Sequence, residues 1–219
     1  MKSIGIGVTN GFMAERFMPG LFDELTDARL PIDDAHIELF EEFDCGDDAN
    51  KVMATLVDKV DWREEKITLF GKSYLQPRLF AWYGDERANY QYSGITLSPL
   101  AWIDELNHIK QRVSAHCGAQ FNSVLLNYYR DHRDSMGMHA DDERELGREP
   151  IIASLSFGAT RVLKLKHKSR KDLKPLRIPL HSSTLMVMRG KTQQHWKHGI
   201  DKLSTPCGPR LNLTFRQIF

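Results

Sequence analysis

The chain has 219 residues, of which 41% are hydrophobic and 27% are charged, a composition typical of one folded globular domain. Its longest apolar stretches, such as 151–155, are about five residues long, far short of a membrane helix, and no signal-peptide pattern opens the sequence. Three widely spaced cysteines without a Cys-x-x-Cys pair argue against a disulfide framework or a structural zinc site. We therefore expect an intracellular protein that is neither secreted nor bound to a membrane.

Charge is unevenly distributed along the chain, although the net charge is only +1. The first 50 residues hold 12 acidic and 3 basic side chains, whereas eight lysines and arginines between residues 161 and 177 face only Asp172. A basic segment of this kind suits a polyphosphate partner such as nucleic acid. A solvent-exposed, lysine-rich hairpin explains it equally well.

The N-terminal part of the sequence predicts an irregular acidic arm followed by a helix. Pro19 and Pro31 interrupt any regular element in the arm. Asp47 and Asp48 can cap a helix that runs to about Val60, because the apolar residues from the cap to Val60 recur at helical spacing.

A second helix is predicted to begin at Ser98, a natural N-cap, with Pro99 in its first turn. Its apolar stripe consists of Leu100, Ile103, Leu106, Ile109 and Val113. After Gly118 the pattern changes to short strands, predicted at 122–129, 151–157, 161–167, 176–180, 184–188, 193–198 and 211–218. Closely spaced strands without intervening helices indicate a barrel or a two-sheet jelly roll. The predicted fold class is therefore α+β, mainly β, with N-terminal helices.

His139 and Asp141 form the first candidate metal-binding pair. On an extended segment, residues two apart point to the same face, so the imidazole and the carboxylate converge. A second histidine would complete a two-histidine, one-carboxylate face that leaves positions open on Fe(II). His181, His195 and His198 are the candidates; the last two would face opposite ways on one strand, and the spacing does not decide between them.

The final strand carries an unusual polar face. Between Arg210 and Arg216, polar residues alternate strictly with Leu211, Leu213 and Phe215. A buried guanidinium needs an anion, and its planar fork prefers a carboxylate. The two arginines are about 20 Å apart along a strand that rises roughly 3.3 Å per residue, so their side chains must lean together to serve one small dicarboxylate. Asn127 and Tyr129 share one face of another strand and offer a matching polar surface.

Four of these motifs together resemble AlkB-like dioxygenases, in the order found in that family. They are Asn127-Tyr128-Tyr129, His139-Ala140-Asp141, His198-Gly199-Ile200 and Arg210-x-Asn212-Leu213-Thr214-Phe215-Arg216. The resemblance runs from about Lys66 to the C-terminus, and it is closest to the subgroup that repairs alkylated double-stranded DNA. Residues 1–65, an acidic arm and a helix, are expected to pack on the same domain as residues 66–219, which would hold nucleotide-recognition hairpins and the dioxygenase core.

The resemblance implies a double-stranded β-helix of jelly-roll type that uses Fe(II), 2-oxoglutarate and O2. It implies that His139, Asp141 and His198 hold the iron, which selects His198 over His195. It further implies a 2-oxoglutarate site whose residues are Asn127, Tyr129, Arg210, Asn212, Thr214 and Arg216.

Base recognition follows from the same resemblance. An enzyme that attacks a methyl group inside a duplex must flip the base out, stack it and keep the gap open. Phe70, with Gly71 and Lys72, matches a wedge that replaces the flipped base, and Tyr90 and Tyr92 match the lining of its pocket. The remaining positions that resemble lesion-contacting residues are Asp142 and Glu143, whose carboxylates would favour a cationic base.

The implied activity is oxidative demethylation of 1-methyladenine and 3-methylcytosine in DNA, giving succinate, CO2 and formaldehyde. Double-stranded DNA is the favoured partner, and the protein is expected to be a monomer, cytoplasmic in a bacterium or nuclear in a eukaryote. Three alternatives remain: a demethylase of RNA or single-stranded DNA, a nucleic-acid-binding module without catalysis, and a protein hydroxylase.

Overall fold

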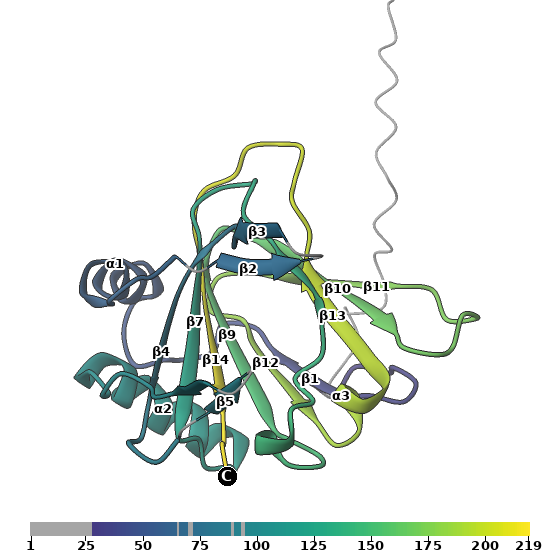
Figure 1. Ribbon diagram of the computed structural model, residues 1–219, viewed down its shortest axis with the longest axis horizontal. Helices are drawn as coiled ribbons and strands as arrows, with labels where there is room; N and C mark the ends of the chain where they lie inside the picture. Colours follow the sequence, from purple (N-terminus) through teal and green to yellow (C-terminus); the bar gives the residue numbers. More distant parts are fainter. Residues whose placement is uncertain (1–27, 65, 70–71, 89, 93–94) are drawn as a thin grey trace, which may run out of the picture.

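A computed structural model describes residues 28–64, 66–69, 72–88, 90–92 and 95–219, and two antiparallel β-sheets dominate it (Figure 1). The larger sheet has six strands in the order β1-β12-β9-β14-β7-β4, and the smaller has four in the order β11-β10-β13-β8. Two separate hairpins, β2-β3 and β5-β6, complete the strands of the described residues. In this part of the chain no helix is long and apolar enough to cross a membrane.

The strands of the larger sheet are β1 (His36–Phe40), β4 (Leu79–Gly84), β7 (Ser123–Tyr129), β9 (Ile152–Gly158), β12 (Leu185–Arg189) and β14 (Arg210–Arg216). The smaller sheet contains β8 (Met136–His139), β10 (Arg161–His167), β11 (Leu176–Leu180) and β13 (Trp196–Ile200). The hairpins consist of β2 (Lys66–Leu69), β3 (Lys72–Leu75), β5 (Tyr90–Tyr92) and β6 (Ile95–Leu97). The helical elements are α1 (Ala49–Lys59), α2 (Asp104–Cys117), α3 (Thr192–His195) and a 3-10 turn, η1 (Arg144–Leu146).

The two faces of the larger sheet are covered differently. Helices α1 and α2 lie on one side of this sheet and the smaller sheet on the other (Figure 1). Leu211, Leu213 and Phe215 of β14 belong to the apolar cluster that includes Leu56 of α1 and Leu106 of α2. The alternate residues of β14 therefore face the smaller sheet, which explains the strict alternation in its sequence. The mainly β, jelly-roll prediction is confirmed.

The first helix begins where its sequence predicts. The Asp48 carboxylate accepts hydrogen bonds from the backbone N–H groups of Asn50 and Lys51, at 3.0 and 3.1 Å, which satisfies N–H groups that have no partner inside the helix. The α-helix that follows ends at Lys59, and Leu56 is buried.

The predicted start of the second helix is wrong. Helix α2 begins at Asp104, after Ile103 as its N-cap, and not at Ser98. The chain before it is extended: the Leu100 N–H donates to the Trp82 carbonyl at 2.9 Å, and the Leu100 carbonyl accepts from the Gly84 N–H at 3.0 Å. Pairing with β4 thus outcompetes the local capping signal, and Leu100 leaves the predicted helical stripe.

Two further predictions need correction in the described residues. The acidic arm is not irregular throughout, because His36–Phe40 forms β1 and pairs with β12 along the whole strand; Pro19 and the rest of residues 1–27 lie outside the described residues. The strand predicted at 193–198 starts only at Trp196. The residues before it form the short helix α3.

Candidate functional site

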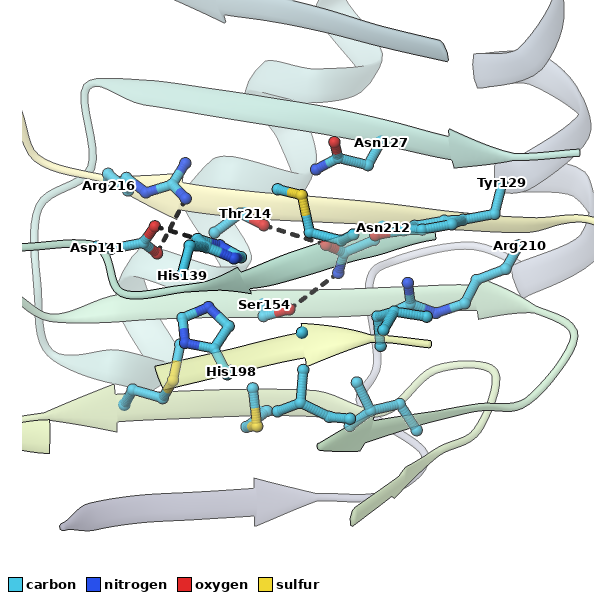
Figure 2. Close-up of a pocket in the computed structure, with 17 residues that line it drawn as sticks. Asn127, Tyr129, His139, Asp141, Ser154, His198, Arg210, Asn212, Thr214 and Arg216 are labelled. Carbon is cyan, nitrogen blue, oxygen red and sulfur yellow. Dashed lines mark hydrogen bonds and ion pairs between the residues drawn. The ribbon is translucent and has the colours of Figure 1, made fainter. Parts of the chain in front are cut away.

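Three metal-ligating side chains meet at the end of the smaller sheet, where Figure 2 shows them close together. His139 ends β8 and lies opposite His198 of β13 in the antiparallel register, with 4.4 Å between the ring centroids. Asp141 follows two residues after His139, and one ligand atom from each of the three lies within 4.8 Å of the others. Two imidazoles and one carboxylate are a donor set that suits a first-row divalent metal and leaves it positions for other ligands, so the donor set fits Fe(II).

The His139 ring is oriented by its own strand. Its Nδ1 lies 2.9 Å from the Gly137 carbonyl oxygen, which can only accept, so Nδ1 carries the proton. This leaves Nε2 as the ring nitrogen that can face a metal, and it lies 3.8 Å from the Asp141 carboxylate. A backbone carbonyl that sets the tautomer is a common partner of a metal-binding histidine.

Asp141 is held from two sides. Its backbone N–H donates to the Gln193 side chain at 3.0 Å, and its carboxylate accepts from Arg216 at 2.9 Å. Burial alone would raise the pKa of Asp141, but Arg216 and the two histidines lower it below its ordinary value. The carboxylate is therefore ionised, as a metal ligand must be.

His198 is prepared in the opposite way. Its burial lowers the pKa of the imidazole to about 4, because a charged ring is poorly solvated in the interior. The ring is therefore neutral at physiological pH and can donate a lone pair to a metal.

The other two candidate histidines lie elsewhere in the described chain. His195 ends α3 and stacks on His167, with 5.8 Å between the ring centroids. His181 places Nδ1 3.0 Å from the Thr160 hydroxyl. Of the three candidate histidines, it is therefore His198 that lies beside His139, which spacing along the chain did not decide.

Arg210 lies at the opposite end of the same pocket (Figure 2). Its residue is only 2% exposed, and its Nη2 donates to the Ser156 hydroxyl at 2.9 Å. Its guanidinium carbon lies 5.1 Å from the centroid of the Tyr129 ring, which belongs to the residue paired with Arg210 across β7 and β14. Its Nε and Nη1 are buried and have no hydrogen-bond partner among the described residues. Burial lowers the pKa of this guanidinium, and no carboxylate of the described residues forms an ion pair with it.

Amide and hydroxyl groups fill the space between the two ends. Asn212 donates to the Ser154 hydroxyl at 2.8 Å and to the Leu155 carbonyl at 3.1 Å, while Thr214 donates to the Asn212 carbonyl oxygen at 3.1 Å. Asn127, opposite Asn212 in the register, accepts from Arg78 at 2.6 Å.

Sequence reasoning missed several of these partners, which are Arg78, Ser154, Ser156 and Gln193. The alternation of small polar and apolar residues over 153–157 was a usable signal, because it repeats the pattern of β14. For Arg78 and Gln193 we find no local signal.

The two arginines of β14 would have to lean together if both serve one small dicarboxylate, as the sequence indicated, and the structure does not show them leaning together. Arg216 reaches Asp141 at one end, and Arg210 reaches Ser156 at the other. Figure 2 shows the pair at opposite ends of the pocket. Strand geometry keeps side chains six residues apart separate.

The predicted base-binding residues are described only in part. Phe70 and Gly71 lie outside the described residues. The backbones of Lys72 in β3 and of Tyr90 and Tyr92 in β5 form hairpin strands, and their side chains are not among those described.

The two predicted lesion-contacting carboxylates follow the metal-binding segment directly. Asp142 is exposed and forms an ion pair with Lys168 at 2.7 Å, and Glu143 is the N-cap of η1. Asp142 thus faces solvent beside a lysine of the basic segment 161–177.

The basic run is largely exposed, but parts of it are neutralised within the chain. Arg170 forms ion pairs with Asp33, Asp34 and Asp172 at 2.7–3.5 Å. Arg161, the first residue of the run, is only 1% exposed and therefore takes no part in a basic surface.

Comparisons with known proteins agree with this geometry. The family model of the 2OG-Fe(II) oxygenase superfamily matches residues 38–216, which begins earlier than the resemblance predicted and takes in most of β1 and all of α1. Alpha-ketoglutarate-dependent dioxygenase alkB homolog 3 of Homo sapiens is 40% identical over 180 residues, which are 78% of this chain and 62% of that protein. DNA oxidative demethylase ALKBH2 of Homo sapiens is 42% identical over 159 residues, 70% of this chain and 61% of that protein.

A solved structure shares the fold. The structure of OsALKBH1 superposes with a TM-score of 0.58 at 18% identity and covers 83% of this chain and 96% of that one. The chain spans less than two thirds of the length of the two human relatives. With the family matched over most of the sequence, the chain belongs to the 2OG-Fe(II) oxygenase superfamily as an AlkB-like dioxygenase, and the cofactors of this family are Fe(II), 2-oxoglutarate and O2.

Proposed function

We propose that this protein removes N-linked methyl groups from 1-methyladenine and 3-methylcytosine in DNA by oxidative demethylation, giving succinate, CO2 and formaldehyde. The observation that carries the proposal is the pocket itself. It combines the donor set of His139, Asp141 and His198 with a buried arginine whose Nε and Nη1 lack a partner. A relative that is 42% identical is named a DNA oxidative demethylase.

His139, Asp141 and His198 would hold Fe(II). When bound, the metal supplies the activation of O2 that oxidation of an unreactive methyl group requires. The protein's part is to keep the ligands ready: the Gly137 carbonyl sets the His139 tautomer, burial keeps His198 neutral, and Arg216 keeps Asp141 ionised and in place.

The dicarboxylate 2-oxoglutarate would lie along the polar face of β14. Arg210 has two buried N–H-bearing atoms without partners, and a carboxylate accepts such a pair in a bidentate manner. Asn127 and Tyr129 lie across from β14 on β7 and would complete that end of the site. Asn212 and Thr214 would line the middle, and Arg216 would lie at the metal end.

Base recognition would come from the elements outside the two large sheets. In the proposal Phe70, with Gly71 and Lys72, fills the gap left by the flipped base, while Tyr90 and Tyr92 line the base pocket. Asp142 and Glu143 would attract the positive charge of a methylated base. A wedge has a purpose only in a stacked duplex, so double-stranded DNA is the preferred substrate.

The test measures succinate and formaldehyde formed with Fe(II) and 2-oxoglutarate in the presence of a 1-methyladenine duplex, its unmethylated twin or the methylated single strand. We expect turnover to depend on methylation of the DNA, and we expect formaldehyde and succinate to form in equal amounts. Phe70→Ala should lower turnover of the duplex about tenfold and that of the single strand much less, since stacking on a side chain is worth about 1–3 kcal/mol.

The matched control is Leu75→Ala, an exposed apolar residue at the far end of strand β3. Equal turnover of methylated and unmethylated duplexes would overturn the substrate proposal and leave the oxygenase. A methylated RNA or single strand preferred over the duplex would replace DNA duplexes as the substrate.

A further inference from the structure

Arg161 is a second buried cation beside the pocket. It begins β10 and is 1% exposed. Its guanidinium donates to three backbone carbonyls: Asp131 at 3.3 Å, Asp134 at 2.9 Å and Asp201 at 2.6 Å. Its Nε is buried and has no hydrogen-bond partner in the part of the chain that the structure describes. Among the described residues no ion pair of Arg161 with a carboxylate is present, so its charge is not neutralised within this part of the chain.

Arg161 and Arg210 contact the same aromatic ring. The guanidinium carbons lie 5.6 and 5.1 Å from the centroid of Tyr129. After burial and the opposing influence of Tyr129, the charge of Arg161 contributes to the lowered pKa of Arg210. Two buried like charges are costly unless an anion compensates them. The positive charges of Arg161 and Arg210 are therefore not balanced by a carboxylate of the described residues.

The three carbonyls bound by Arg161 belong to the loops that leave the ligand-bearing strands. Asp131 and Asp134 lie between Tyr129 of β7 and the start of β8, the strand that ends in His139. Asp201 follows directly after β13, which carries His198. One guanidinium thus ties both loops to the ring of Tyr129.

We propose that Arg161 is a positioning residue for the dicarboxylate cosubstrate. It holds Tyr129 and the two loops against Arg210, and its uncompensated charge favours a ligand with a second carboxylate over one that lacks it. The inference rests on the proposed function, because it requires that 2-oxoglutarate binds in this pocket.

The experiment is calorimetric titration of the protein under anaerobic conditions with Mn(II), which occupies Fe(II) sites without turnover. The ligands are 2-oxoglutarate and 2-oxobutyrate, which lacks the second carboxylate. In Arg161→Gln we expect the Kd of 2-oxoglutarate to rise about tenfold, as removal of a nearby buried charge predicts, while the Kd of 2-oxobutyrate changes less than about twofold. Arg161→Lys keeps the charge and should restore most of the preference.

The matched control is Arg133→Gln, which removes a cation from the loop between β7 and β8 that Arg161 contacts. Arg133 is 76% exposed at its side chain and pairs with the Asp131 carboxylate at 2.7 Å, so both Kd values should stay at the wild-type level. If Arg161→Gln does not fold, Arg161→Met offers a side chain of similar length without charge.

Equal weakening of both ligands in the uncharged variant would show a merely structural role and overturn the inference, as would an unchanged Kd for 2-oxoglutarate. A wild-type protein that binds Mn(II) but neither ligand would overturn the proposed function itself. If the wild type and Arg161→Gln bind 2-oxoglutarate equally well, only the role of Arg161 is overturned.

Discussion

Arg216 and Arg210 are the same residue type on the same face of the same strand, yet their surroundings differ completely. Arg216 donates to the Asp141 carboxylate at 2.9 Å and keeps 14% of its side chain exposed. Arg210 is 2% exposed, its described hydrogen bond goes to a neutral hydroxyl, and two of its nitrogens have no partner.

The difference separates two uses of a guanidinium that lines the pocket. A guanidinium paired within the protein holds its carboxylate in one position, and here that carboxylate is a candidate metal ligand. A guanidinium left unpaired at full burial is costly unless an anion comes from outside. The contrast therefore divides the pocket into a metal-binding end, where the guanidinium is paired with a carboxylate of the chain, and a second end, where the guanidinium has no carboxylate partner among the described residues.

The largest effect is expected from His139→Ala at the metal-binding end. Removing one of three ligands should lower metal affinity more than about 100-fold, beyond the loss typical of outer partners, and abolish demethylation. This variant is cleaner than Asp141→Ala, which would also leave the largely shielded Arg216 without its carboxylate partner. Bound Mn(II) and succinate formation are the measurements.

His195→Ala is the matched control, because this histidine lies three residues from His198 but stacks on His167 instead. It should bind metal like the wild type. If His195→Ala lost the metal and His139→Ala kept it, the assignment of the metal site would be wrong.

Arg210→Gln should produce the next largest effect, at the end where the guanidinium has no carboxylate partner among the described residues. Each charge-assisted hydrogen bond is worth about 1.5–3 kcal/mol, so two of them predict a Kd for 2-oxoglutarate at least about 100-fold higher. Metal affinity should hardly change, since Arg210 does not contact the metal ligands. Titration calorimetry with Mn(II) in place distinguishes the two quantities. Loss of metal binding in this variant would erase the division between the two ends.

Arg216→Gln should have the smallest effect of the three. The glutamine can still donate a neutral hydrogen bond to Asp141, so metal affinity should fall only about tenfold, as is typical when an outer partner of a ligand is lost. Competition with a chelator measures this loss. A fall as large as that of His139→Ala would mean that Arg216 supports more of the pocket than one carboxylate.

Local patterns predicted much of this architecture. The alternation along 210–216 reflects burial on both faces of a central strand, and β10 and β11 were predicted with their observed bounds, 161–167 and 176–180. The Asp48 cap was readable because capping is a contact between residues close in sequence. Ser98 gave an equally good local signal and failed, because Leu100 pairs with β4 instead.

Some residues of the pocket were likewise predictable from local patterns, and others were not. His139 and Asp141 were found as a pair because they are two residues apart, whereas the choice of His198 over His195 depended on a family resemblance until the register of β8 and β13 showed it. Arg161 looked like one more charge of a basic surface run. Its burial follows from the carbonyls of two distant loops, which no spacing along the chain reveals.

The sequence by itself determined the mainly β fold, the histidine and carboxylate pair, and the polar face of the last strand, because each depends on the short-range periodicity of one element. Only the tertiary structure decided which arginine is paired, which is left without an anion and which second histidine meets the first. Those outcomes depend on contacts between strands far apart in the chain, where register and burial, and not residue type, set the chemistry.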